Sequence, residues 1–309
     1  MMKKIKLLKQ ALLSAAVFTF AVSAFADIQV EDSHGMQTLP KTPQRVAALN
    51  WDIAEQVLEL GVTPIVVPNI KEYSEWVVRP AVPESVEDIG TRMEPNLERL
   101  AELKPDVIII ASPQLGLQKK LEAIAPVLYF HTYNEDHNNA EAAIKNYRLM
   151  AKALGKEAYA EQRLAQMESQ LDAMKEKLAA AYNNDFPKVI SYRFADTKSI
   201  YLYGDNSIPQ YALQRLGFEP AMPQPATQWG VTQKRVKELG RLPAETLALY
   251  YLPFEQQAEL DKSNLWQAIP FVKAGNVAAV EPAWNYGGAM AILYNAEVLT
   301  NALLELAPK

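Results

Sequence analysis

Short apolar runs alternate with helical patterns along most of the chain after residue 44. Such alternation is typical of α/β units, in which a buried strand is followed by a helix. The runs predict strands at 45–49, 63–67, 106–111, 127–130, 188–194, 199–203, 246–252 and 276–280. The helical patterns predict helices at 52–60, 96–103, 117–124, 207–216 and 289–306. We therefore expect an α/β fold with two lobes.

The middle of the chain breaks this alternation. From residue 138 to about 182 the good helix formers Ala, Glu, Lys, Leu and Met dominate, and Gly155 is the one breaker. The pattern predicts one helix at 138–154 and a second at 156–182. We expect an N-terminal lobe at 27–137, a linker helix at 138–155, a C-terminal lobe at 156–309, and a ligand cleft between the lobes. A single stiff helix would allow only a small opening motion; the alternative is that it packs on one lobe alone.

The first 26 residues have the pattern of a secretory signal. Four Lys precede an apolar run at 11–25, and Ala24-Phe25-Ala26 supplies small residues at the positions that a signal peptidase reads. We predict a signal peptide at residues 1–26, a mature chain that begins at Asp27, and a periplasmic location. A membrane anchor is the alternative for the same run.

Composition narrows the function classes. The net charge is −5, and the predicted signal carries four Lys without a carboxylate, so the rest of the chain is more acidic still. An acidic chain without a basic block argues against nucleic acid as a partner. The absence of Cys excludes disulfides, thiolate metal sites and Cys catalysis. No P-loop, GxSxG or HExxH motif is present. We therefore expect a binding protein that is not an enzyme, with a secreted hydrolase as a minor alternative.

Aromatic residues placed between the predicted elements suggest the binding surface. Trp76, Trp229 and Trp284 lie outside apolar runs, and Tyr286 follows Trp284 by two positions. Further candidates are Tyr73, Tyr201 and Tyr203. A cleft lined by such rings suits a bulky ligand of mixed polarity. Core packing between the lobes is the alternative for each ring.

Polar candidates are few. Arg92 precedes a predicted helix, where its guanidinium can offer donors to oxygen acceptors, unless it forms a surface salt bridge to Glu94 or Glu98. His131 and His137 flank a polar loop, but their spacing matches no standard ligand pattern. Arg193 or Lys198 are further candidates for a positive charge in the cleft.

Four runs of the sequence resemble one family. They are Arg45-Val-Ala-Ala-Leu-Asn-Trp51, Asp88-Ile-Gly-Thr-Arg-Met-Glu-Pro-Asn-Leu-Glu98, Leu265-Trp-Gln-Ala-Ile-Pro-Phe-Val-Lys-Ala-Gly275 and Pro282-Ala-Trp-Asn-Tyr-Gly287. Over essentially the whole mature length, the chain is similar to the periplasmic ferric-hydroxamate siderophore binding proteins. The last run is the narrower signal and points to hydroxamates.

The resemblance implies a shallow aromatic cleft that holds an iron(III)–siderophore complex. It implies that Arg92 bonds the iron-bound oxygens, that Trp76, Trp229, Trp284 and Tyr286 line the cleft, and that an ABC importer permease in the inner membrane is the partner. The chain departs from the family where Gln114 falls at about the position of a donor Tyr, and we expect the Gln114 amide to bind the ligand in its place. The family also has one surface carboxylate on each lobe that docks the permease. Lys119 and Lys237 fall near those two positions in this sequence, so the nearby Glu122 and Glu238 are the docking candidates.

The small number of candidate cations favours a hydroxamate ligand, because Arg92 is one good candidate and not part of a cluster. A ferric tris-hydroxamate is near neutral and its iron is fully coordinated by the chelator, so the protein needs no metal ligand and no cofactor. A tris-catecholate complex carries about three negative charges and favours several cations around it. A catecholate siderophore, haem or cobalamin on the same scaffold remains the alternative. We expect a monomer.

Overall fold

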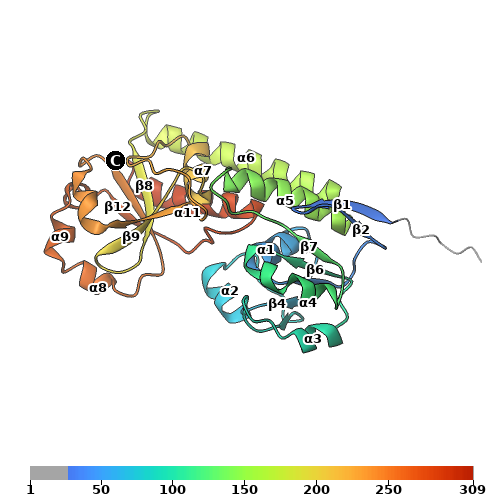
Figure 1. The fold of residues 1–309 in the computed structure, drawn as a ribbon. Coiled ribbons are helices and arrows are strands. Elements are labelled where there is room, and N and C mark those ends of the chain that lie inside the picture. Colours follow the sequence, from blue (N-terminus) through green and yellow to red (C-terminus); the bar gives the residue numbers. More distant parts are fainter. Residues whose placement is uncertain (1–26, 309) are drawn as a thin grey trace, which may run out of the picture.

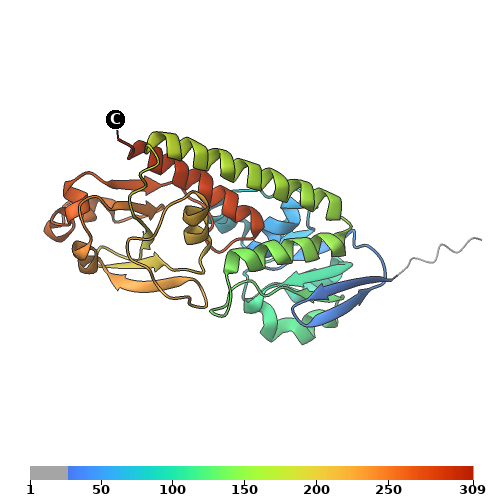
Figure 2. The same ribbon diagram turned by 90° about the horizontal axis from the view of Figure 1, so that it is seen from above.

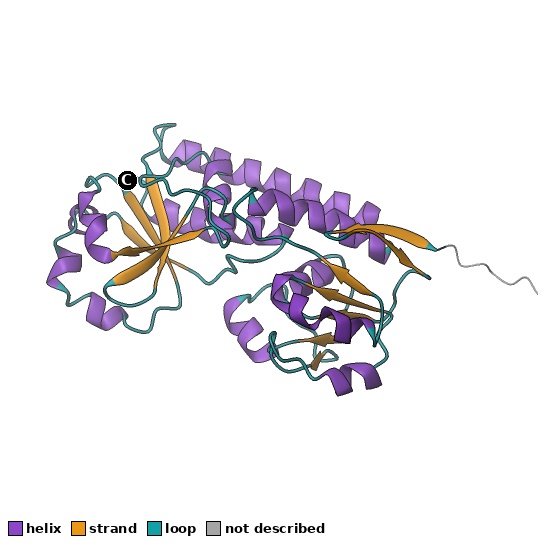
Figure 3. Cartoon of the chain, viewed as in Figure 1, coloured by secondary structure: helices purple, strands orange, loops and turns teal. Residues whose placement is uncertain are grey.

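The computed structural model describes residues 27–308, and the predicted signal peptide at 1–26 lies outside the described residues. The described chain forms two α/β lobes with long helices packed along them (Figures 1 and 3). The predicted fold class is confirmed. Within residues 27–308, every helix is too short or too polar to cross a membrane.

The N-terminal lobe contains a five-stranded parallel sheet in the order β5-β4-β3-β6-β7. Its strands are β3 (Val46–Ala48), β4 (Val66–Val67), β5 (Glu87–Asp88), β6 (Val107–Ile110) and β7 (Val127–Tyr129). All four residues of β6 are apolar and buried, as expected of a strand covered on both faces. The helices of this lobe are α1 (Trp51–Glu59), α2 (Ile70–Trp76), α3 (Leu97–Glu102), η1 (Ser112–Leu117) and α4 (Gln118–Glu122).

The C-terminal lobe contains a mixed sheet in the order β10-β9-β8-β11-β12. Its strands are β8 (Val189–Phe194), β9 (Ser199–Tyr203), β10 (Val231–Arg235), β11 (Leu247–Tyr251) and β12 (Val277–Val280). Strands β8, β11 and β12 run parallel, whereas β9 is antiparallel to β8 and to β10. Its shorter helices are α7 (Ile208–Arg215), η2 (Val236–Arg241), α8 (Gln257–Leu260), α9 (Asn264–Gln267) and α10 (Pro270–Lys273).

Three long helices connect and cover the lobes: α5 (Asn139–Leu154), α6 (Glu157–Ala181) and α11 (Ala289–Glu305). The Asn138 side chain accepts hydrogen bonds from the first turn of α5, and Gly155 ends that helix at a φ of 64°. The two predicted central helices are thus confirmed. Figure 2 shows α6 beside α11, and α5 packs on α6 and on the first strand, β1 (Ile28–Asp32). The assignment of residues 138–155 as the linker stays a prediction.

A buried carboxylate ties these helices together. Glu59 of α1 forms a salt bridge of 2.7 Å with Arg163 of α6, and the Tyr294 hydroxyl of α11 donates to Glu59. The Tyr147 hydroxyl of α5 donates to the Glu59 carbonyl at 3.0 Å. Because one helix of the N-terminal lobe bonds all three long helices, their packing fixes how the lobes meet.

Candidate functional site

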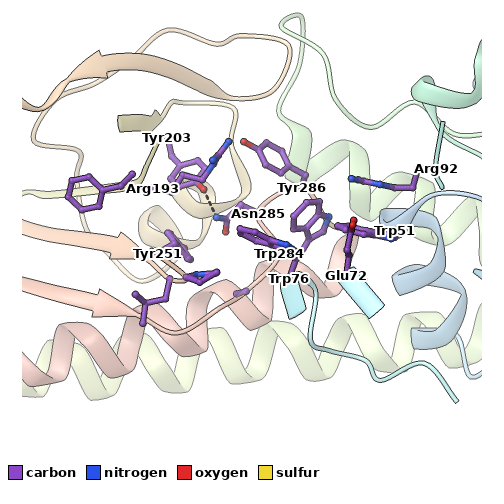
Figure 4. Close-up of a pocket in the computed structure, with 14 residues that line it drawn as sticks. Trp51, Glu72, Trp76, Arg92, Arg193, Tyr203, Tyr251, Trp284, Asn285 and Tyr286 are labelled. Atoms are coloured by element: carbon purple, nitrogen blue, oxygen red, sulfur yellow. Dashed lines mark hydrogen bonds between the residues drawn. The ribbon is translucent and has the colours of Figure 1, made fainter. Parts of the chain in front are cut away.

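A cleft lies between the two lobes and has a volume of about 850 Å³, including the part open to solvent. It is lined by Trp51, Glu72, Trp76, Arg92, Arg193, Phe194, Tyr203, Tyr251, Leu252, Pro253, Ala283, Trp284, Asn285 and Tyr286. Figure 4 shows Arg92, Trp51 and Glu72 on one side, Arg193, Tyr203 and Tyr251 on the other, and Trp284 and Tyr286 between them. The size and the mixture of rings with a few polar groups suit one bulky ligand.

Arg92 is held in the loop after β5. Gly90, at a φ of 98°, makes the turn into this loop, and a Cβ there would lie 3.1 Å from the Glu94 carbonyl. The Arg92 amide donates to the Asn69 side chain at 3.1 Å, and its carbonyl accepts from Gln114 Nε2 at 2.9 Å. Bonds on both sides of the residue therefore fix its backbone.

The guanidinium of Arg92 lies over the Trp51 ring, with 3.8 Å between Cζ and the ring centroid. Trp51 is itself buried, and its Nε1 donates to the Pro68 carbonyl at 2.9 Å. Among the described residues Arg92 forms no ion pair, so the alternative of a salt bridge to Glu94 or Glu98 is wrong. A guanidinium held over an indole ring without an ion-pair partner has N–H donors for a ligand oxygen.

An aromatic row crosses the cleft from one lobe to the other. Trp51 meets Trp284 edge-on at 5.2 Å between ring centroids, and Trp284 meets Tyr286 at 5.4 Å. Tyr286 is 6.2 Å from Trp229, which stacks on Tyr133 at 5.8 Å. Trp51 and Tyr133 are buried, so Trp284, Tyr286 and Trp229 provide the exposed aromatic surface of this row.

The C-terminal wall of the cleft comes from β8, β9 and β11. It carries Arg193, Tyr203 and Tyr251. The Asn285 amide donates to the Tyr203 hydroxyl, and the Tyr251 hydroxyl donates to Asn295 at 2.7 Å. Burial raises the pKa of Tyr203 and Tyr286, and the positive charge of Arg193 partly opposes it in both. The tyrosines are thus neutral donors and acceptors at physiological pH.

The predicted aromatic residues take three different places. Trp284 and Tyr286 line the cleft from the loop before α11, while Trp229 lines an adjoining pocket that shares Arg92, Trp284 and Tyr286 with it. Trp76 also lines the cleft and is 40% exposed. It is the last residue of α2, so its expected position in a loop is wrong. Tyr73, the further candidate, is fully buried in the core.

Gln114 does not reach the cleft. Its side chain is fully buried, and its Oε1 accepts from the Ala111 amide at 3.2 Å while its Nε2 donates to Arg92. With both polar ends bonded inside the protein, Gln114 has no donor for a ligand in this structure. It positions Arg92 instead.

The histidines lie in a separate polar pocket. His131 and His137 are 6.2 Å apart between ring centroids, and each has its Nε2 near a backbone carbonyl. In residues 27–308 no group of three or more potential ligand side chains is placed to hold a metal.

Two buried acids, Asp52 and Glu55, lie on α1, the helix that begins at the cleft residue Trp51. Burial raises the pKa of Asp52 to about 6, and it raises the pKa of Glu55 well above its usual value. The Glu55 carboxyl accepts from the amide of Gly288, at the start of α11, at 3.2 Å. The first helix of one lobe therefore holds the loop that carries Trp284 and Tyr286.

We expect Glu55→Gln to raise the melting temperature at pH 7.5. A carboxyl whose pKa is raised by folding stabilises the fold fully only below its unfolded pKa of about 4.5, and that contribution is lost as pH rises. Gln imitates the protonated acid at every pH, so the difference in Tm narrows as pH falls toward about 4.5. Scanning calorimetry from pH 7.5 to 4.5 measures this. The exposed Glu245→Gln is the control, and an equal gain at all pH values would contradict the protonation argument.

Several cleft residues carried no site signal in the sequence. Trp51 begins a helix with an apolar pattern, and Tyr251 ends an apolar strand, so both read as core. Arg193, one of two further cations considered, does reach the cleft. Lys198 is absent from the cleft lining. Glu72 lies on the unpredicted helix α2.

Several known proteins with a similar chain are named for binding iron complexes. The chain is 30% identical over 262 residues to the iron(3+)-hydroxamate-binding protein FhuD of Escherichia coli K12, covering 84% of this chain and 87% of that protein. It is 27% identical over 252 residues to the Fe(3+)-citrate-binding protein YfmC of Bacillus subtilis 168, covering 80% of this chain and 76% of that protein. The crystal structure of FhuD from Vibrio cholerae with bound Fe3+-Desferal matches with a TM-score of 0.83 and 48% identity, over 85% of this chain and 99% of that chain.

The periplasmic binding protein family matches residues 46–283, which span both lobes and the cleft from just before Trp51 to just before Trp284. The chain therefore belongs to the periplasmic binding protein family.

Proposed function

We propose that this protein captures ferric hydroxamate siderophores in the periplasm and delivers them to an ABC importer in the inner membrane. The observation that carries the proposal is the cleft itself. An aromatic row joins the two lobes, and Arg92 lies over Trp51 without a carboxylate partner among residues 27–308. The likeness to FhuD of Vibrio cholerae and of Escherichia coli supports the hydroxamate class.

The chemistry of the cleft fits a chelate whose iron needs no further ligand. Hydroxamate oxygens bound to iron(III) remain hydrogen-bond acceptors, and a guanidinium held in place offers them two parallel donors. The rings bury the apolar linkers of the chelator while the neutral Tyr hydroxyls accept or donate at its amide groups. In this arrangement the protein contacts only the siderophore, and the siderophore supplies all the ligands of the iron.

A charged iron chelate is the second candidate. Arg193 adds a second cation to the cleft, and the Fe(3+)-citrate-binding protein YfmC is among the relatives. A hydrolase is disfavoured because, among residues 27–308, Glu72 is the one carboxylate that lines the cleft, whereas sugar hydrolysis by acid and base uses two facing carboxylates.

Titration with iron chelates tests the proposal. Ferrioxamine B and ferrichrome should quench Trp fluorescence with a Kd below about 10 μM, or close to −7 kcal/mol, because Trp51, Trp76 and Trp284 line the cleft. Iron-free desferrioxamine and ferric EDTA are the controls for the chelator and for iron. If a ferric tris-catecholate quenches and neither hydroxamate does, the hydroxamate assignment fails.

Under the same proposal, Glu122 and Glu238 dock the permease of the importer, with the protein acting as a monomer. Glu122 is exposed at the end of α4, and Glu238 lies in η2, where it accepts the Arg235 amide at 3.0 Å. The hydrogen bond from the Arg235 amide and then the positive charges of Lys234, Arg241 and Lys237 lower the pKa of Glu238, so a permease arginine is attracted less strongly there.

We expect Glu122→Lys to impair delivery without weakening ligand binding, since Glu122 is absent from the cleft lining. ATP hydrolysis by the reconstituted importer, stimulated by ferrioxamine-loaded protein, should fall by about threefold or more, as for loss of a docking charge pair. Glu98→Lys, on α3 of the same lobe, is the control. Equal stimulation by the Glu122 variant and the unchanged protein would exclude Glu122 as a docking residue.

A further inference from the structure

The charged groups of the cleft have different surroundings. Arg92 lies over Trp51, and hydrogen bonds fix its backbone. The function proposed above assigns it to the iron-bound oxygens of the chelate. Arg193 comes from the opposite lobe, on β8, and Glu72 comes from α2. Within residues 27–308, neither Arg193 nor Glu72 belongs to a salt bridge.

Arg193 is prepared for a ligand in the same way as Arg92. Its guanidinium lies over the Tyr201 ring, with 4.2 Å between Cζ and the ring centroid. Its neighbours in the cleft are the hydroxyl groups of Tyr203 and Tyr286, which are neutral. This guanidinium is half-buried among rings and hydroxyls and has no carboxylate partner within residues 27–308, so an anionic group of a ligand can pair with it.

Glu72 has the opposite sign and a more open position. It is exposed, it lines the cleft on the side of Trp51 and Trp76, and its negative charge acts on Arg92. Figure 4 shows it beside Trp51, across Trp284 and Tyr286 from Arg193. One wall of the cleft therefore offers a ligand both a cation, Arg92, and a carboxylate, Glu72, whereas the other offers the single cation Arg193.

We propose that Arg193 is a specificity-determining residue, which makes affinity depend on the charge carried at the periphery of the iron chelate. A pendant carboxylate strengthens binding through Arg193, and a pendant ammonium is favoured by Glu72 instead. The iron-bound core of the chelate is the same in both cases, and it is bound by Arg92 and the aromatic row. The inference rests on the proposed function and names the chemistry that distinguishes one ferric hydroxamate from another at this site.

Three chelates with one core and different pendant charges test it. Ferrioxamine B carries a pendant ammonium, its N-acetyl form is neutral there, and its N-succinyl form ends in a carboxylate. Their Kd values are measured by fluorescence quenching with the unchanged protein, Arg193→Gln, Arg193→Lys and Glu72→Gln at low and at physiological salt. Circular dichroism and the Tm of each variant show that it is folded.

We expect Arg193→Gln to weaken binding of the N-succinyl chelate about threefold to tenfold relative to the N-acetyl chelate, as for a partly exposed charge pair. Arg193→Lys should keep most of this preference because it keeps the charge. Glu72→Gln should weaken the ammonium form relative to the N-acetyl form. Salt should reduce both preferences.

Two outcomes overturn the inference, and they differ from failure of the proposed function. If Arg193→Gln weakens all three chelates by the same factor, Arg193 supports the core or the fold and does not read peripheral charge. If the three chelates keep the same relative affinities in every variant, neither charge matters. If the unchanged protein binds none of the three, the proposed function itself fails, and this inference falls with it.

Discussion

Replacing Arg92 by Ala weakens binding of ferrioxamine B by about 1.5–3 kcal/mol, or roughly tenfold to a hundredfold in Kd. The reason is that its guanidinium is stacked 3.8 Å above Trp51, with its backbone fixed by Asn69 and Gln114, so its donors are already oriented when the ligand arrives. A preorganised charged donor loses little entropy on binding. The measurement is isothermal titration or fluorescence quenching of the folded variant.

Two further variants separate the role of Arg92 from general effects. Arg92→Lys keeps the charge but loses the paired donors, and its affinity should fall between those of the Ala variant and the unchanged protein. Arg148→Ala removes an arginine whose exposed ion pair with Glu161 lies outside the cleft, and its affinity should not change. If Arg92→Ala binds ferrioxamine B as tightly as the unchanged protein does, Arg92 does not contact the ligand.

The parts of the fold that could be predicted are those with local signals. The helix α5 follows from Asn138 and Gly155, since a capping side chain and a left-handed glycine mark its ends. The strand β6 follows from four consecutive apolar residues. By contrast, β10 is an edge strand of mixed polarity, and α2 is a short helix that follows the left-handed Asn69 without a side-chain cap, so neither has a local signal. Tertiary contacts decide these elements.

The same distinction applies to the site. Arg92, Trp284 and Tyr286 could be found because large or charged residues in loops have no role in a periodic pattern. Trp51 and Tyr251 could not, because a ring at the start of an amphipathic helix or at the end of a buried strand has the same pattern as a core residue. The inward direction of Gln114 depends on the turn of η1 and on its bonds to Ala111 and Arg92, which no spacing reveals.

Gly288→Ala should destabilise the protein. Gly288 begins α11 against α1, and a Cβ there would lie 2.0 Å from Cγ of Gln56, which is itself buried. Overpacking of this kind costs about 1–3 kcal/mol, which lowers the Tm by roughly 2–5 °C in a protein of this size. Relief by moving the α11 start would shift Trp284 and Tyr286, so we expect weaker binding of ferrioxamine B as well.

A double substitution tests whether this contact is the cause. Gln56→Ala removes the Cγ atom that the new Cβ would meet, so adding it to Gly288→Ala should restore part of the lost stability, and the two effects should be non-additive. Gly240→Ala is the matched control, because a Cβ there has no heavy atom within 4 Å and the backbone has no positive φ. Strict additivity of the two substitutions would mean that the lobes accommodate residue 288 in another way. Recovery of stability together with ligand affinity would show that the close approach of α11 to α1 holds the aromatic side of the cleft in place.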